Sequence, residues 1–371
     1  MYPLSHALAR KRNNFDLLRL FGAMAVVYGY AFLIQSPDGR ADPVWAAFGF
    51  DSTGSLGIYA FFLISGILVT ASFERQRSAG RFVMLRIARV WPPVMAGMLL
   101  VIFVVGPVLT TLPLRDYFAS SASWATLDNF SSITRHEFRL SPGVFTHGQL
   151  PDVISQPLWT LTECYFMVLV AGMAGLLSSR WRILGAALLG VAAWSLRVHF
   201  DGLHDFGIGL RDFSSKPDGY SFWPEFFFLL GMVLYGWRDG IRVDGWSACL
   251  LVMTFLAFRD TAGAQPLFYL TFVYGLLWLG TTPMLRRFAP RHDYSFGICI
   301  YGLIVQQTLA SIAPQLNHLA ALAIGAPFIF AFAYLSWHGM ERPVLSWCRR
   351  RLARAPNAVR AAPLVSDASA R

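Results

Sequence analysis

Charged residues are scarce in this chain. Only 14% of its 371 residues are Asp, Glu, Lys or Arg, whereas 55% are hydrophobic. A soluble globular domain carries roughly 25% charged residues, so this composition excludes an ordinary soluble protein. The apolar residues fall in blocks of about 15–22 residues, close to the length that a helix needs to cross a bilayer. The sequence therefore predicts an all-α membrane protein built as a bundle of transmembrane helices.

Paired cysteines and the motifs of soluble enzymes are also missing. A Gly-x-Ser-x-Gly nucleophile motif and a phosphate-binding glycine loop do not occur. The cysteines show no paired spacing, which disfavours a disulfide framework or a zinc site, and we expect them to be small buried side chains. They are Cys164, Cys249, Cys299 and Cys348. A short run of His and Asp near residue 200 lacks a further ligand cluster, so no metal site is predicted.

The basic residues predict the orientation of the chain. We predict about ten spans with both termini cytoplasmic, which puts 22 of the 31 Lys and Arg side chains on the cytoplasmic side and 8 outside. This is the positive-inside pattern, so the net charge of +10 does not indicate nucleic-acid binding. Residues 1–345 are predicted to form one transmembrane domain, and residues 346–371 a basic, disordered cytoplasmic tail. The predicted spans are about 15–35, 57–73, 91–111, 158–177, 182–199, 222–237, 245–258, 267–284, 294–312 and 319–338.

The first predicted span contains a charged arginine. Arg19 lies about one turn inside it, and a charge inside a bilayer suggests a function by default. The alternative is a side chain that snorkels to the cytoplasmic interface. Tyr30 follows about three turns later, so both side chains share one helix face and are separated by about 16 Å of rise. That face would present a cation near the cytoplasm and a hydroxyl nearer the outside.

A second pair of cations is predicted at the same cytoplasmic end. Arg86 and Arg89 are three residues apart in RFVMLRIARVWPP, so they face one way on a helix. We expect Pro92 and Pro93 to begin the third span, and the charged segment before them to contribute little to the core. Arginine forks suit phosphate oxygens, although ordinary positive-inside charge would explain the pair equally well.

Polar residues interrupt three further predicted spans. Ser65 and Gly66 break an aromatic run and would allow a close helix approach or a polar lining. Glu163 stands at the start of a span, and Gln306 and Gln307 lie deep in another. Each could line a polar path or form hydrogen bonds between helices.

Seven stretches between about residues 13 and 347 carry a resemblance to a known family. They are NNFDLLRLFGAMAVVYGYAF, GSLGIYAFFLISGILVTASF, RFVMLRIARVWPP, GPVLTTLPLRDYF, SPGVF with QPLWTLTE, YSFGICIYGLIVQQ and SWHGMERPVLSW. In this order they resemble the acyltransferase-3 family of membrane O-acyltransferases, close to those that acetylate bacterial exopolysaccharide and lipopolysaccharide sugars.

The resemblance implies a function and a location. An acetyl or similar acyl group would pass from acyl-CoA, bound from the cytoplasm, to a hydroxyl of a cell-surface or exported carbohydrate. The acceptor would be a polysaccharide or a lipid-linked oligosaccharide. The protein would be a multi-pass protein of the bacterial inner membrane, with the lipid bilayer and no nucleic acid among its partners.

The resemblance also assigns roles to residues. Arg19 matches an arginine of the family's first helix, and Arg86 and Arg89 match an arginine pair associated with acyl-CoA, so these three are assigned to the donor. The catalytic assignments are Tyr30, Arg19 and Glu163. Four residues in or beside the quoted motifs are assigned to substrate binding: Asp16, Ser65, Trp159 and Tyr301.

Two positions depart from the family pattern. Tyr30 stands where the family has a histidine that accepts the proton of the sugar hydroxyl, a task worth roughly 10²–10⁴-fold. Tyrosine, with a reference pKa of about 10, is a poor base at pH 7, so we expect a weak enzyme or an inactivated variant. Glu163 follows Trp159 by four residues instead of the family's five, which turns its side chain by about 100° on a helix.

Two other functions remain open. A transporter or flippase of lipid-linked sugars would also need a polar path between helices, although the internal repeats of inverted-repeat transporters are not visible. A catalytically dead scaffold in polysaccharide assembly would fit Tyr30. Transfer of labelled acetyl groups from acetyl-CoA separates the three functions.

Overall fold

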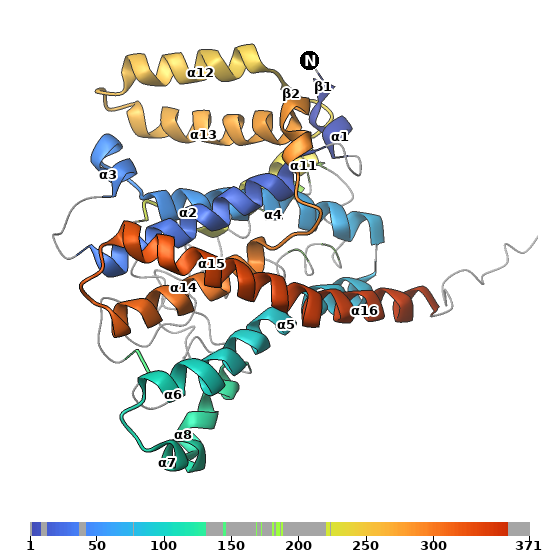
Figure 1. Cartoon of the computed structure of the whole chain (residues 1–371). Coiled ribbons are helices and arrows are strands. Elements are labelled where there is room, and N and C mark those ends of the chain that lie inside the picture. The colour runs from blue at the N-terminus through green and yellow to red at the C-terminus, as the bar shows by residue number, and fades with distance from the viewer. Residues whose placement is uncertain are drawn as a thin grey trace, which may run out of the picture.

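The residues that the computed structural model describes are mostly helical, which confirms the expected all-α class (Figure 1). These are residues 2–8, 13–36, 42–76, 78–130, 220–222 and 224–354, with a few isolated positions between 144 and 187. The first elements are β1 (Tyr2–Pro3), α1 (Leu4–Ala7), α2 (Phe15–Gln35), α3 (Pro43–Phe48), α4 (Thr53–Gln76), α5 (Ala79–Leu100), η1 (Val101–Val105), α6 (Gly106–Leu109), α7 (Leu114–Ala119), α8 (Ser121–Trp124) and η2 (Ala125–Phe130). The later elements are α11 (Pro224–Gly236), β2 (Arg242–Val243), α12 (Gly245–Phe258), α13 (Ala264–Thr281), η6 (Pro283–Phe288), α14 (Ser295–Ile312), α15 (His318–Ser336), η7 (Trp337–Glu341) and α16 (Arg342–Arg354).

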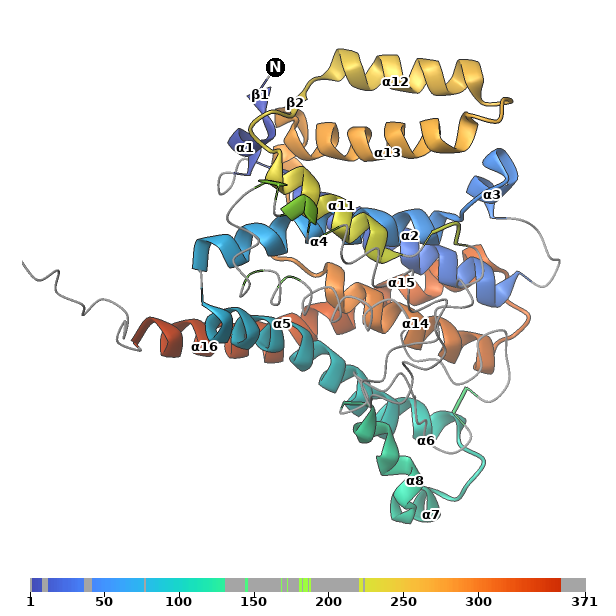
Figure 2. The same ribbon diagram turned by 180° about the vertical axis from the view of Figure 1, so that it is seen from behind.

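The helices lie in layers, as two opposite views show (Figures 1 and 2). The α12–α13 hairpin forms one edge, α2 and α4 form the middle with α11, and α14 and α15 lie on the other side. The short helices α6, α7 and α8 project away from these layers. The strands β1 and β2, two residues each, pair in an antiparallel manner beside α1.

Among the described residues, five helices are long and apolar enough to cross a membrane. Two shorter apolar helices, α11 and α12, fall in the predicted sixth and seventh spans. The predicted spans 158–177 and 182–199 lie outside the described residues, so the total of ten and the side of each terminus stay predictions. The five candidates are Phe15–Gln35, Thr53–Arg75, Ala79–Leu109, Ser295–Ile312 and His318–Ala353.

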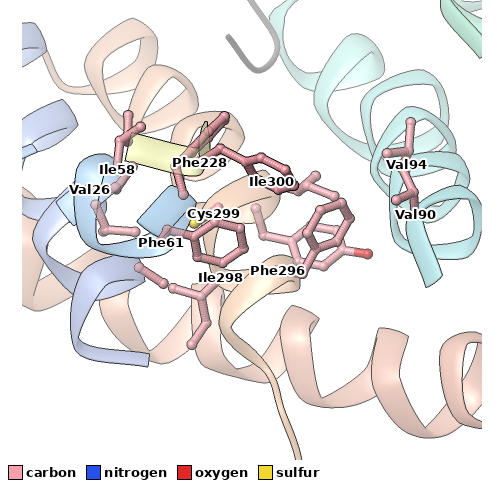
Figure 3. Close-up of a cluster of buried hydrophobic side chains, with 14 of the residues drawn as sticks. Val26, Ile58, Phe61, Val90, Val94, Phe228, Phe296, Ile298, Cys299 and Ile300 are labelled. Atoms are coloured by element: carbon pink, nitrogen blue, oxygen red, sulfur yellow. The ribbon is translucent and has the colours of Figure 1, made fainter. Parts of the chain in front are cut away.

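The core forms where α4 packs between α2 and α11 and where α14 packs against the other side of α2. Figure 3 shows side chains of these helices converging, with Phe61 of α4 facing Phe228 of α11 and Cys299 of α14. Glycine allows α4 and α11 to approach closely, because a β-carbon on Gly66 would lie 2.1 Å from the carbonyl oxygen of Phe228. Small residues at helix contacts are typical of membrane bundles. The expected close approach at Gly66 is therefore confirmed.

The helix that contains the third predicted span begins before that span. Ser78 accepts a hydrogen bond from the backbone of Arg81 and caps α5, so the helix starts at Ala79 and contains Pro92 and Pro93 in its interior. The prolines therefore do not begin the helix, and the expectation that they begin the membrane span stays a prediction. Prolines are tolerated inside membrane helices where neighbouring helices satisfy the freed backbone groups. Independently of the freed groups, the Tyr301 hydroxyl of α14 donates to the Pro93 carbonyl at 3.2 Å and joins α14 to α5.

The last span continues well past its predicted end. The helix runs from α15 through η7 and α16 to Arg354, so it enters the segment predicted as a tail, and residues 355–371 lie outside the description. The α16 helix lies beside α5 (Figures 1 and 2). Leu345 and Cys348 pack against Ala88, and Arg81 donates to the Leu352 carbonyl at 2.8 Å. The apolar face of α16 thus has a packing partner, which keeps this segment helical.

Candidate active site

The Arg19 side chain is held inside the bundle by an ion pair with Asp293 and a cation–π contact with Phe61. Its Nη1 atom donates to the Oδ2 atom of Asp293, just before α14, at 2.7 Å. Its guanidinium group also lies over the Phe61 ring, 4.7 Å from the centroid. Only 14% of the Arg19 side chain is exposed. We call the end of the bundle that carries Arg19 and Asp293 the arginine end.

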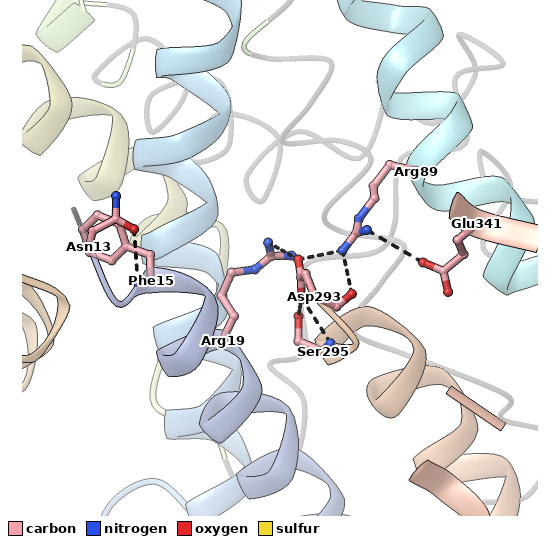
Figure 4. Close-up of polar contacts among 7 residues, drawn as sticks. All are labelled: Asn13, Phe15, Arg19, Arg89, Asp293, Ser295 and Glu341. Atoms are coloured by element: carbon pink, nitrogen blue, oxygen red, sulfur yellow. Dashed lines mark hydrogen bonds and ion pairs between the residues drawn. The ribbon is translucent and has the colours of Figure 1, made fainter. Parts of the chain in front are cut away.

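Arg89 of α5 binds the Asp293 carboxylate as well, and it also approaches a second carboxylate in η7. Its Nη2 atom donates to the Oδ2 atom of Asp293 at 2.6 Å, and its Nη1 atom lies 3.8 Å from the Oε2 atom of Glu341 in η7. The guanidinium group also lies over the Trp337 ring at 5.1 Å. Figure 4 shows Arg19 and Arg89 approaching Asp293 from opposite sides. The Asp293 carboxylate, at the start of α14, therefore contacts arginines from both α2 and α5. Glu341 connects η7 to the same site through Arg89.

Asp293 is ionised at neutral pH. Burial by itself would raise the pKa of this carboxyl group, but the positive charges of Arg19 and Arg89 and hydrogen bonds from Ser295 together lower it to about 2. The Ser295 backbone N–H donates to Asp293 at 3.2 Å, and the Ser295 hydroxyl donates to the same carboxylate oxygen. The cluster thus contains a permanent anion between two permanent cations.

Arg86 lies one turn before Arg89 on the same helix. Its guanidinium group lies over the Phe82 ring at 5.6 Å. Of the three arginines expected to bind the donor, Arg19 and Arg89 therefore meet at Asp293, and Arg86 lies one helical turn from Arg89. The expectation that the charged segment contributes little to the core is wrong for Arg89, since only 15% of its side chain is exposed and it joins two carboxylates.

Tyr30 lies towards the other end of α2. Because α2 is unbroken from Phe15 to Gln35, Arg19 and Tyr30 lie on one helix face, as expected. Tyr30 packs against the hydrophobic core, and its buried hydroxyl has no hydrogen-bond partner within the part of the chain that is described. Both amide atoms of the fully buried Gln306 in α14 are likewise unpartnered there. Buried polar groups are normally hydrogen-bonded, so both can still bind a polar group.

The other assigned residues are scattered. Asp16 is exposed in the first turn of α2, at the arginine end and away from Tyr30. Ser65 is buried in α4, and the buried Tyr301 uses its hydroxyl to join α14 to α5. Trp159 and Glu163 lie outside the described residues. Within those residues, no group of three or more His, Cys, Asp or Glu side chains could hold a metal ion.

Asp293 and Glu341 are site residues that sequence reasoning missed. Both stand at the edge of an apolar segment, where a carboxylate without a partner is unfavourable. Asp293 directly precedes the YSFG stretch, and Glu341 lies within SWHGMERP. Those positions could have marked the two carboxylates as site candidates. The sequence could not show their partners, however, because Arg19 is 274 residues from Asp293.

Comparison with known proteins identifies the family. The family described as "Acyltransferase domain" matches residues 12–349. "Nodulation protein 10" of Rhizobium leguminosarum bv. viciae is 29% identical over 374 residues, which cover 93% of this chain and 96% of that protein. "O-acetyl transferase" of Shigella phage Sf6 is 22% identical over 342 residues, which cover 91% and 97%. No solved structure matches the chain. The sequence resemblance is confirmed: the chain belongs to the acyltransferase-3 family and is an acyltransferase.

Proposed function

We propose that this protein is a multi-pass O-acyltransferase of the bacterial inner membrane that uses acyl-CoA to acylate an exported or cell-surface carbohydrate. The group transferred is an acetyl or similar acyl group. The observation that carries the proposal is the meeting of Arg19 and Arg89 at one end of a helix whose same face carries Tyr30. A relative of similar length is named an O-acetyl transferase, which supports the acetyl group.

The arginine end is proposed to bind the phosphates of the donor. CoA carries a diphosphate and a 3′-phosphate, and arginine guanidinium groups bind such oxygens through paired hydrogen bonds. Asp293 holds Arg19 and Arg89 in place at 2.7 and 2.6 Å. Incoming phosphates share or replace these contacts, and Arg86 adds a third cation. The pantetheine arm then extends along α2 towards Tyr30, about 16 Å away.

Tyr30 is proposed to act as a hydrogen-bond donor where the acyl group meets the sugar. The sugar hydroxyl oxygen attacks the thioester carbon and the new C–O bond forms. The C–S bond breaks, and the proton lost from the sugar hydroxyl ends on the departing sulfur, so that CoA leaves as its thiol. A donor aimed at the developing oxyanion stabilises the transition state, and the Tyr30 hydroxyl is buried and unpartnered among the described residues. Because a phenol with a pKa of about 10 is a poor base at pH 7, we expect slow transfer.

Acetyl transfer in membranes tests the proposal. Membranes containing the protein receive labelled acetyl-CoA and a carbohydrate acceptor fraction, and label in the carbohydrate is measured. We expect transfer that falls at least about tenfold in the Arg86→Ala/Arg89→Ala double variant. Arg350→Ala, an exposed substitution on α16, is the matched control and should transfer normally. If no labelled acetyl group is found in the carbohydrate fraction, the proposal is rejected.

One observation favours a second function. Tyr30 in place of the family's histidine fits a non-catalytic member of a polysaccharide-assembly complex. That protein would still bind acyl-CoA at the arginine end but would transfer no label. Movement of lipid-linked sugars across proteoliposomes without acetylation would instead indicate a flippase.

A further inference from the structure

A cluster of five aromatic rings lies at the arginine end. His292 and Tyr294 come from the segment before α14, and the other three come from the end of α15 and from η7: Tyr334, Trp337 and His338. The Tyr334 and His338 rings are 4.1 Å apart between centroids. His292 lies 5.5 Å from His338 and 5.8 Å from Trp337. Tyr294 lies 6.1 to 6.2 Å from the three rings of α15 and η7. We call these five residues the aromatic cluster.

The aromatic cluster adjoins the ion pairs of Asp293 with Arg19 and Arg89 at the arginine end. Asp293 stands between His292 and Tyr294 in the chain and binds both Arg19 and Arg89. The Arg89 guanidinium group lies over the Trp337 ring at 5.1 Å. A ligand with its phosphates on the arginines would therefore have aromatic rings within reach of its neighbouring groups.

The rings of the aromatic cluster are accessible. None of the five residues is fully buried, and Tyr334 is 54% exposed. The Trp337 indole nitrogen, by contrast, is buried and has no hydrogen-bond partner in the described part of the chain. A buried indole N–H usually finds an acceptor. An interfacial belt explains Tyr and Trp near a membrane surface, but it does not explain two histidines among the rings or an unpartnered donor beside Arg89.

We propose that the aromatic cluster binds the adenine ring of the acyl donor. The inference rests on the proposed function and adds the place where the base of the acyl-CoA donor binds, since a thioester on pantetheine alone offers no base to stack. A purine has a flat π-face for the Tyr334 and His338 rings, and its ring nitrogens can accept from a donor such as the Trp337 N–H. Base–aromatic stacking contributes enough free energy to change binding about tenfold per base.

Donor truncation tests the inference. The purified full-length protein is assayed with acetyl-CoA and with acetyl-4′-phosphopantetheine, which has the same thioester but no adenosine. In a Tyr334→Leu/His338→Leu variant, we expect the KM for acetyl-CoA to rise about tenfold, with kcat and the KM for the short donor unchanged. Tyr334→Phe, which keeps a ring, should behave like the wild type. Trp347→Leu on α16 removes a ring that is 51% exposed outside the cluster and is the matched control.

The outcomes separate this inference from the proposed function. An unchanged KM for acetyl-CoA in the double variant would show that the rings are only an interfacial belt. An equal rise for both donors would mean general damage to the site and would also reject base recognition. If no form of the protein transfers acetyl groups, the proposed function fails, and binding of adenosine 3′,5′-bisphosphate decides the inference. We then expect about tenfold weaker binding in the double variant, with inorganic pyrophosphate binding unchanged; equal bisphosphate binding would overturn it.

Discussion

Neutralising Asp293 should destabilise the protein by a predictable amount. Asp293→Asn keeps the size of the side chain and some of its hydrogen bonds but removes the charge between Arg19 and Arg89. In the folded protein the pKa of Asp293 is lowered from its ordinary value of 3.8 to about 2, by the arginines and Ser295 against the opposing effect of burial. A shift of that size corresponds to about 2–3 kcal/mol of stability at neutral pH. The side chain is only 15% exposed, so solvent screening is modest.

The effect should depend on pH with a defined sign. A carboxyl group whose folded pKa lies below its unfolded value stabilises the protein fully above the unfolded pKa. This stabilisation is lost as the pH falls through the folded pKa. The difference between the wild type and Asp293→Asn should therefore be constant from pH 7 to about pH 5, and it should shrink between about pH 4 and pH 2.

Denaturation of the protein in detergent measures the difference. Unfolding is followed by tryptophan fluorescence at a series of pH values for the wild type, for Asp293→Asn and for the control Asp260→Asn. Asp260 is 89% exposed and pairs with the exposed Arg259, so its substitution should leave stability unchanged. Equal stability of the wild type and Asp293→Asn at pH 7 would refute the reasoning, because the ion pairs would then contribute nothing.

Three other predictions concern donor, acceptor and orientation. Arg86→Ala and Arg89→Ala should each weaken acyl-CoA binding, measured by equilibrium binding, but only Arg89→Ala should also lower stability, since Arg89 pairs with buried carboxylates. Unchanged binding in the double variant would place the donor site elsewhere. Tyr30→His should raise acetyl transfer at least about tenfold without changing acyl-CoA affinity, and equal rates would mean that position 30 is not where a base acts. Reporter fusions after residue 130 should report the outside and fusions after residue 350 the cytoplasm; a cytoplasmic signal at residue 130 would reverse the assigned sides.

The sequence by itself determined the helical class, the family and the local geometry of α2. Inside a bilayer every backbone polar group must be satisfied within the chain, so long apolar blocks can only be helices. The shared face of Arg19 and Tyr30 follows from helical periodicity within one segment. The same reasoning placed Arg86 and Arg89 on one helix, but it did not predict that this helix continues through Pro92 and Pro93.

Only the tertiary structure decided which charges meet. Asp293 is 274 residues from Arg19 and 204 from Arg89 in the sequence, and no local pattern links them. Their contact depends on close packing between α2 and α14, where a β-carbon on Gly302 would lie 2.5 Å from Val27. The same packing carries Trp337 under Arg89. Ion pairs and ring contacts form between side chains that the packed helices bring together, whereas helical periodicity is a property of each segment alone.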